Sequence, residues 1–163
     1  MNLDKFEKII NESFEKRDKI NADSDKSIID AIKETIELTD QGKIRVAEKK
    51  NGSWLVNQWV KKAILLSFRV NKMEILRGPY TSWYDKVPGK SVNWKEEDWK
   101  KAGYRHVPNG VVRKGSFIAK NAVLMPCFVN LGAYVDEGTM IDTWASVGSC
   151  AQVGKNCHIS GGA

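Results

Sequence analysis

A six-residue period runs through the last third of this sequence and constrains its fold more than any other feature. Every sixth residue from Val111 is large and apolar, and the residue four places later belongs to a second, mostly small series. The large residues are Val111, Phe117, Val123, Val129, Val135, Ile141, Val147, Val153 and Ile159, and the second series is Gly115, Asn121, Cys127, Ala133, Thr139, Ala145, Ala151, Cys157 and Ala163. A period of six fits neither a helix nor a continuous strand, so it indicates one short strand and one bend per repeat. Three such strands close a triangular coil, which predicts a parallel β-helix whose stacked coils bury one apolar axis.

The residues ahead of this period are predicted to form a separate α+β domain. Apolar residues at helical spacing predict amphipathic helices over residues 3–17 and from Ser24 or Ser27 to Asp40, the second of which Gly42 would end. A third, mostly buried helix is expected over residues 58–70.

Asn51-Gly52 marks a tight hairpin turn, with Ile44 and Val46 beginning the first strand and Trp54 and Val56 on the returning one. The aromatic-rich stretch 71–90 predicts long loops or a short hairpin. Trp94 and Trp99 then lie on a short helical piece. The predicted domains are therefore residues 1–104 and 105–163.

Composition excludes several classes of protein. The charge of +6 is carried by interleaved Lys and Glu, without the basic cluster and aromatics of a nucleic-acid site, so we expect no nucleic-acid partner. No apolar run is long enough to cross a membrane, and the charged N-terminus does not resemble a secretory signal. Three cysteines without a CxxC pair suggest neither disulfides nor a zinc site, which favours the cytoplasm and no bound metal.

The sequence stops inside a repeat. Ala163 is the fifth residue of the ninth hexapeptide, and no polar capping element follows the last coil. We therefore expect a β-helix of about three coils that is a C-terminally truncated version of a longer one.

Two segments resemble a known family. The stretch GYRHVPNGVVRKGSFIAKNAVLMPCFVNLGAYVDEGTMIDTWASVGSCAQVGKNCHISGG is similar to tetrahydrodipicolinate N-succinyltransferases of bacterial lysine biosynthesis, and RVAEKKNGSWLVNQWVKKAILLSFR and YDKVPGK resemble that family's first domain. The resemblance implies that the β-helix is left-handed and that the protein assembles as a homotrimer. It also implies succinyl transfer from succinyl-CoA, a cosubstrate and not a bound cofactor, to the amine of ring-opened tetrahydrodipicolinate (2-amino-6-oxopimelate).

The resemblance assigns two site residues in this chain. Arg105, in GYR, matches the family's substrate-binding arginine, and a guanidinium is well suited to a dicarboxylate acceptor. Asp142, in IDTWAS, matches the substrate-site aspartate and is the candidate catalytic residue that holds the amine, facing a subunit interface. Asp136 occupies the same position one repeat earlier, where an acidic residue would serve turn geometry alone.

Other candidates receive weaker roles. Trp144 is expected to pack against a neighbouring subunit or to shape the acceptor pocket, and neither His106 nor His158 resembles the catalytic histidine of other hexapeptide acyltransferases. Ser160-Gly161-Gly162 reads as a bend and not a phosphate loop, because no GK[ST] follows. The coenzyme-binding residues are unknown and are expected beyond residue 163, so the chain alone is predicted to be inactive.

Three alternatives stay open on the residues alone. The chain could be a different hexapeptide acyltransferase, for example one acting on a sugar nucleotide. It could also be a non-catalytic scaffold subunit whose open coil end pairs with a partner. Nucleic-acid binding is the third, and it predicts salt-sensitive retention on duplex DNA.

Overall fold

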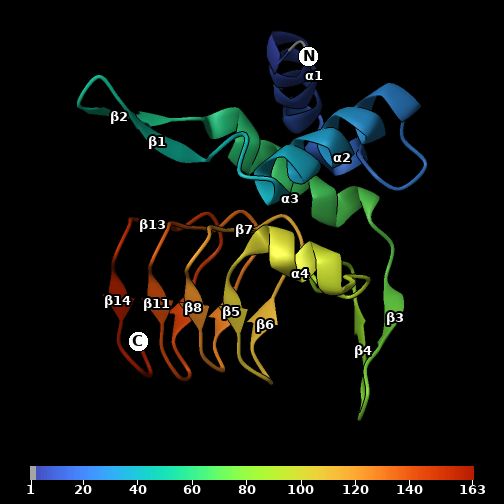
Figure 1. Cartoon of the computed structure of the whole chain (residues 1–163). Helices are drawn as coiled ribbons and strands as arrows, with labels where there is room; N and C mark the ends of the chain where they lie inside the picture. Colours follow the sequence, from blue (N-terminus) through green and yellow to red (C-terminus); the bar gives the residue numbers. More distant parts are fainter. Residues whose placement is uncertain (1–2) are drawn as a thin grey trace.

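The computed structural model describes residues 3–163 and shows a group of helices lying over one side of a β-helix (Figure 1). The C-terminal part is a three-sided parallel β-helix, as the six-residue period predicts, and is consistent with the left-handed form. One face holds β5 (Arg105–His106), β8 (Val123–Leu124), β11 (Met140–Ile141) and β14 (His158–Ile159). The second holds β6 (Val111–Val112), β9 (Phe128–Val129) and β12 (Ser146–Val147), and the third holds β7 (Phe117–Ile118), β10 (Tyr134–Val135) and β13 (Gln152–Val153).

The predicted inward-facing series is correct from Val129 onward and wrong by one residue in the first coil. Leu124 is fully buried and pairs with Ile141, whereas the neighbouring Val123 pairs with Met140 on the outer side. The cause is a short corner around Pro126, which places only four residues between the inward Leu124 and the inward Val129 where other corners of the coil place five. The interior column on this face is therefore Leu124, Ile141 and Ile159.

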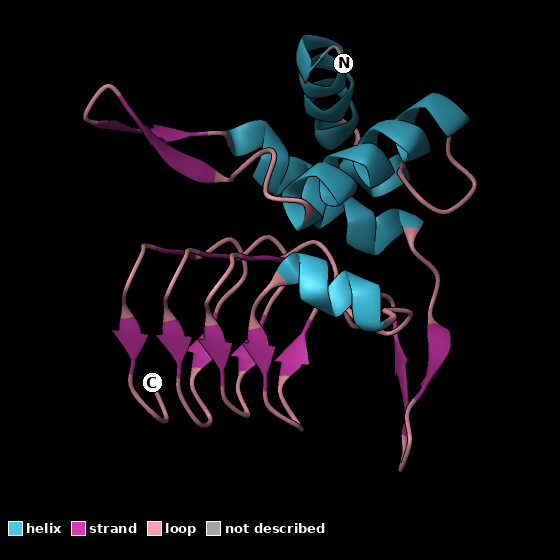
Figure 2. Cartoon of the chain, in the orientation of Figure 1, coloured by secondary structure: helices cyan, strands magenta, loops and turns pink. Residues whose placement is uncertain are grey.

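The N-terminal part is a three-helix group, and its helices lie close to where the hydrophobic spacing predicts them (Figure 2). They are α1 (Leu3–Glu15), α2 (Lys26–Asp40) and α3 (Gln58–Val70), with the 3-10 turn η1 (Arg17–Lys19) after α1. Ile10, Ile32 and Ile64, one from each helix, are buried in a common core. Gly42 follows α2 in the left-handed conformation (φ +69°), as expected for a residue that ends a helix.

Two hairpins extend from the helices. In the first, β1 (Ala47–Lys50) pairs with β2 (Ser53–Val56) around Asn51 and Gly52, both of which have the positive φ of the predicted tight turn. Its first strand begins later than predicted, because Ile44 and Val46 pack into the helical core instead. In the second, β3 (Glu74–Arg77) pairs with β4 (Ser82–Asp85), so the stretch 71–90 contains the short hairpin of the two predicted alternatives.

The first coil is covered by the short helix α4 (Glu96–Ala102) and the aromatic residues around it. Trp94, Trp99 and Tyr104 meet edge to face, with the two tryptophan rings 4.8 Å apart, and join the apolar core of the β-helix. The helix therefore closes the end of the coil that would otherwise expose its interior.

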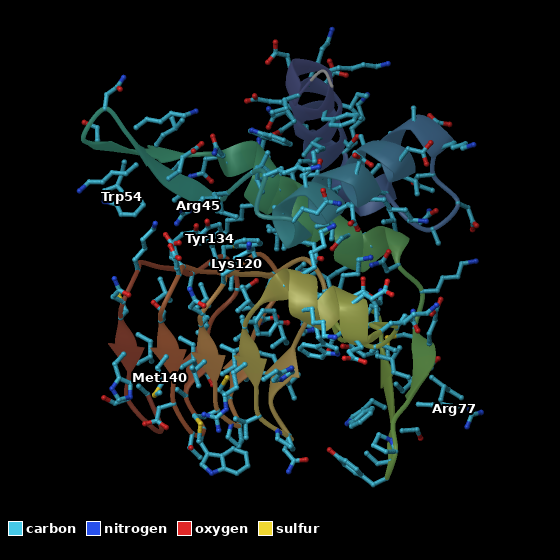
Figure 3. The ribbon with its side chains drawn as sticks, in the orientation of Figure 1. Arg45, Trp54, Arg77, Lys120, Tyr134 and Met140 are labelled. Atoms are coloured by element: carbon cyan, nitrogen blue, oxygen red, sulfur yellow. The ribbon has the colours of Figure 1, made fainter. Side chains whose placement is uncertain are left out.

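The helices and the β-helix also share a packed junction. Leu131 of the β-helix belongs to the buried core of the helices, and the Arg45 guanidinium lies 3.7 Å from the centre of the Tyr134 ring (Figure 3). Arg45 Nε donates a hydrogen bond of 3.0 Å to Gln152 Oε1. A domain boundary at residue 104 stays a prediction, because these contacts tie the two parts together.

Candidate functional site

Arg105 lies at the start of one outer column on the β-helix. It pairs in register with Val123, which pairs with Met140, which pairs with His158, so these four residues share the outer side of one face. Figure 3 shows Met140 on this face. Adjacent strands are about 4.8 Å apart, so the backbones at Arg105 and Met140 are separated by roughly 10 Å. The exposed Arg105 side chain has no hydrogen-bond or ion-pair partner among residues 3–163.

Asp142 lies at the corner that follows β11, and two contacts fix its carboxylate. Oδ1 accepts a 2.7 Å hydrogen bond from the backbone N–H of Thr143, and Oδ2 lies 3.2 Å from His158 Nε2. Both contacts favour the charged form and lower the pKa of the Asp142 carboxyl, the Thr143 N–H more than His158. Asp142 therefore presents a stable, partly exposed negative charge on the outer surface.

Asp136 provides an internal comparison. Its Oδ1 accepts a 2.8 Å hydrogen bond from the backbone N–H of Glu137, which repeats the corner geometry of Asp142. In the described part of the chain, however, the Asp136 carboxylate has no second hydrogen-bond or ion-pair partner. The turn contact is thus common to both corners, and only Asp142 also engages a histidine.

The two histidines have different surroundings. His158 is on β14 with 58% of its side chain exposed, whereas His106 packs against the rings of Trp99 and Tyr104. Burial lowers the pKa of His106, and its Nε2 has no hydrogen-bond partner among the residues that the structure describes. His106 therefore belongs to the packed end of the β-helix, while His158 is brought to the candidate site.

The contact with His158 was not foreseen from the sequence. Asp142 and His158 are 16 residues apart, which does not match the six-residue period of buried positions. The length of one coil, 18 residues, could have indicated the contact. His158 follows Met140 by 18 residues and pairs with it on the neighbouring strand, and Met140 is two residues before Asp142. Comparing residues one coil apart pairs His158 with Met140, which places His158 within two residues of Asp142.

Comparison with known proteins finds related sequences for both parts of the chain. A family profile described as "Tetrahydrodipicolinate N-succinyltransferase N-terminal" matches residues 5–70. Three curated proteins named 2,3,4,5-tetrahydropyridine-2,6-dicarboxylate N-succinyltransferase match nearly the whole chain. The protein of Pelagibacter ubique is 69% identical, and the match covers 99% of this chain and 60% of the relative. The protein of Methylorubrum extorquens is 57% identical (97% of this chain, 57% of the relative), and that of Parvibaculum lavamentivorans is 54% identical (99% of this chain, 59% of the relative).

The chain is related to these N-succinyltransferases. The relationship suggested by the sequence motifs is thereby confirmed over nearly all of the 163 residues. This chain spans about 60% of the length of the curated N-succinyltransferases it matches. The matched region includes Arg105, Asp142 and His158, since it covers 99% of the chain.

Trp144 lies two residues after Asp142 and has an unusual backbone. Its φ is +61°, a left-handed conformation that bulky residues rarely adopt, and 73% of the residue is exposed. Its backbone N–H donates a 2.7 Å hydrogen bond to the Pro126 carbonyl. The corner thus holds a large aromatic ring in solvent beside the Asp142–His158 pair.

Neither the Ser160-Gly161-Gly162 segment nor the cavities of the structure form part of the candidate site. Ser160-Gly161-Gly162 forms a bend, in which the Gly162 N–H donates to the Thr143 carbonyl at 2.9 Å. Two cavities of about 240 and 400 Å³ lie between α2, the end of α3 and Pro88, and neither includes Arg105 or Asp142. The candidate residues Arg105 and Asp142 lie on the outer surface of the β-helix.

Residues 3–163 contain no group of three His, Cys, Asp or Glu side chains placed to hold a metal ion. No helix within the same range is long and apolar enough to span a bilayer.

Proposed function

We propose that this chain provides the acceptor-binding face of an N-succinyltransferase that transfers succinyl from succinyl-CoA to ring-opened tetrahydrodipicolinate. The observation that supports this most strongly is the 69% identity to the Pelagibacter ubique enzyme across nearly the whole chain. It is also supported by a guanidinium that has no partner among residues 3–163 and by a fixed carboxylate at the corner that ends the same face of the β-helix.

The spacing of the two charges suits the proposed acceptor. Arg105 lies two strand spacings, roughly 10 Å, from Met140, and Asp142 follows Met140 by two residues at the next corner. A seven-carbon dicarboxylate spans about 7 Å between its ends when extended, taking about 1.2 Å per bond from the reach of an extended chain. Arg105 would bind one carboxylate of the acceptor, and the negative charge of Asp142 would attract the amine at the other end.

The chemistry of the reaction needs more than charge. The acceptor amine must lose a proton before it attacks, and the thioester carbonyl must be close to it and polarised. In this proposal the chain contributes the amine end of that arrangement, and succinyl-CoA is a cosubstrate.

Assembly and location belong to the same proposal. We expect a homotrimer, in which the exposed corner of Asp142 and Trp144 faces a neighbouring subunit, and light scattering would then give three times the chain mass of 18.4 kDa. A monomer mass would contradict the trimer. We expect the protein in the cytosol, where the three free cysteines would stay reduced.

Calorimetric titration with 2-aminopimelate, a stable analogue of the acceptor, tests the proposal. The unmodified chain should bind it, and Arg105→Ala and Asp142→Asn should each weaken binding by about 10-fold or more, the value of a lost charge-assisted contact. Asp136→Asn is the matched control, because it alters the equivalent corner on another face of the coil, and it should leave binding unchanged.

Two results would contradict the proposal. One is the absence of binding by the unmodified chain. The other is equal loss in Asp136→Asn and Asp142→Asn, which would mean that the carboxylates act only through corner geometry or net charge.

A further inference from the structure

The pairing of Asp142 with His158 is more specific than the proposed function requires. A single carboxylate would be enough to attract an amine, yet the coil places an imidazole 3.2 Å from Oδ2. Oδ1 is already engaged by the Thr143 N–H, so the carboxylate is held in one orientation toward the ring. An Asp–His pair of this kind is a recurrent way to orient an imidazole for proton transfer.

The contact assigns the protons of the ring. A carboxylate only accepts hydrogen bonds when ionised, so His158 Nε2 carries the proton that points to Asp142. In neutral histidine the other nitrogen, Nδ1, then has a free lone pair. Among residues 3–163 nothing hydrogen-bonds to Nδ1, and 58% of the side chain is exposed, so this lone pair is accessible to a ligand.

The two side chains differ in their suitability as a base. The Thr143 N–H and His158 lower the pKa of Asp142, and a carboxylate with a low pKa is a weak proton acceptor. Imidazole is the side chain that most often serves as a general base in enzymes. The geometry of the pair therefore assigns the proton transfer to His158, and the low pKa of Asp142 agrees with that assignment.

We propose that His158 is the catalytic base of the succinyl transfer and that Asp142 positions it, an inference that rests on the proposed function. One proton of the acceptor ammonium passes to His158 Nδ1, and from there to solvent, which frees the nitrogen lone pair. The nitrogen attacks the thioester carbonyl, so that a C–N bond forms and the C–S bond breaks. A second proton of that nitrogen passes through Nδ1 to the departing thiolate, which leaves as a thiol.

The test uses a donor that needs no binding site for the nucleotide part of coenzyme A. Succinyl N-acetylcysteamine thioester carries only the reacting end, and the amide formed with 2-aminopimelate is measured by chromatography, which the free cysteines of the chain do not disturb. The chain is expected to be inactive with succinyl-CoA, whose binding residues are expected beyond residue 163, but at pH 7.5 it should accelerate the reaction with this short donor. His158→Gln should lower that rate by about 100-fold, the usual scale of general-base catalysis. Asp142→Asn should lower it by roughly 10-fold, as expected of a positioning residue, and Asp136→Asn should not change it.

The pH dependence separates catalysis from a structural role. Near pH 10 a large fraction of the amine is already unprotonated, so the rate of His158→Gln should approach that of the unmodified chain. A loss that is equal at both pH values, or no loss at pH 7.5, would overturn the inference.

The absence of any acceleration by the unmodified chain would also overturn the inference. The titration with 2-aminopimelate then shows whether the proposed function has failed too, because binding that depends on Arg105 would leave that function standing.

Discussion

Single residues at the corners of the β-helix show where the backbone is constrained. The left-handed conformation recurs at nine corner residues: Asn109, Gly115, Asn121, Gly132, Gly138, Trp144, Cys150, Asn156 and Gly162. Glycine and asparagine tolerate this conformation, whereas other residues lose about 1–2 kcal/mol in it. Cys150 is partly buried against the helical core, but Trp144 is mostly exposed and gains little packing in return. A strained aromatic residue beside Asp142 is thus better explained by a ligand or a partner than by stability of the chain.

At the same corner, the low pKa of Asp142 predicts how the stability of the fold depends on pH. Its pKa in the folded chain is below the ordinary value of 3.8, so its charge stabilises the fold above the carboxyl pKa of the unfolded chain. That contribution is lost as the pH falls through the folded pKa. His158→Gln removes the second of the two main causes, so the titration midpoint of Asp142 should move up toward 3.8 without reaching it, since the Thr143 N–H remains.

Carbon-13 NMR of the Asp142 carboxyl measures that midpoint directly. Lys155→Gln is the control, because Lys155 lies in the same coil but pairs with Glu137 and not with Asp142. An unchanged midpoint in His158→Gln would show that the 3.2 Å contact does not persist in solution.

In the strands of the first coil, substitution can test which of two adjacent residues faces the interior. Val111 and Val112 are adjacent and chemically identical, yet Val111 is 47% exposed and Val112 only 4%. Val112→Ala should therefore lower the free energy of unfolding by about 2 kcal/mol, from two lost methyl groups and a small cavity. Val111→Ala should change it by less than about 0.5 kcal/mol, as for other surface positions.

Urea unfolding of the two variants decides between the registers. A larger loss in Val111→Ala than in Val112→Ala would restore the register that the six-residue count gives. Equal losses would mean that the first coil is not packed as the structure shows.

The architecture could be predicted from sequence because each bend and strand of the β-helix is local. The register of the first coil could not, since Val111-Val112, Phe117-Ile118 and Val123-Leu124 are each a pair of adjacent apolar residues and either member fits inside. One residue indicated the shift of register. Asn121 is the one large polar residue at the small, inward position of the repeat, and in the structure the neighbouring Ala122 is buried there instead. For the site, family resemblance supplied Arg105 and Asp142, but His158 depends on contact between coils, which a count along the chain does not display.

Across the whole molecule, one buried ion pair joins the helices to the β-helix. Lys90 Nζ lies 2.7 Å from Asp40 Oδ2 at the end of α2 and donates to the Ser116 carbonyl of the first coil at 3.0 Å. Asp40 Oδ1 in turn accepts the backbone N–H of Gly115 at 2.7 Å. Burial lowers the pKa of Lys90 while Asp40 opposes that effect, so each charge is tolerated because the other is present.

This mutual dependence predicts a strong asymmetry between single and double substitution. Lys90→Met leaves the Asp40 carboxylate largely buried without its counter-charge and should lower the free energy of unfolding by about 3–5 kcal/mol. Adding Asp40→Asn to Lys90→Met removes the uncompensated charge and should recover part of that loss, whereas Lys100→Met, which breaks an exposed pair with Glu96, should cost less than about 1 kcal/mol. Urea unfolding of the four chains measures each value. If Lys90→Met costs no more than Lys100→Met, the junction does not couple the helices to the β-helix, and the position of α2 over the first coil would depend on apolar contacts such as that of Ile36 with Gly115 and Leu131.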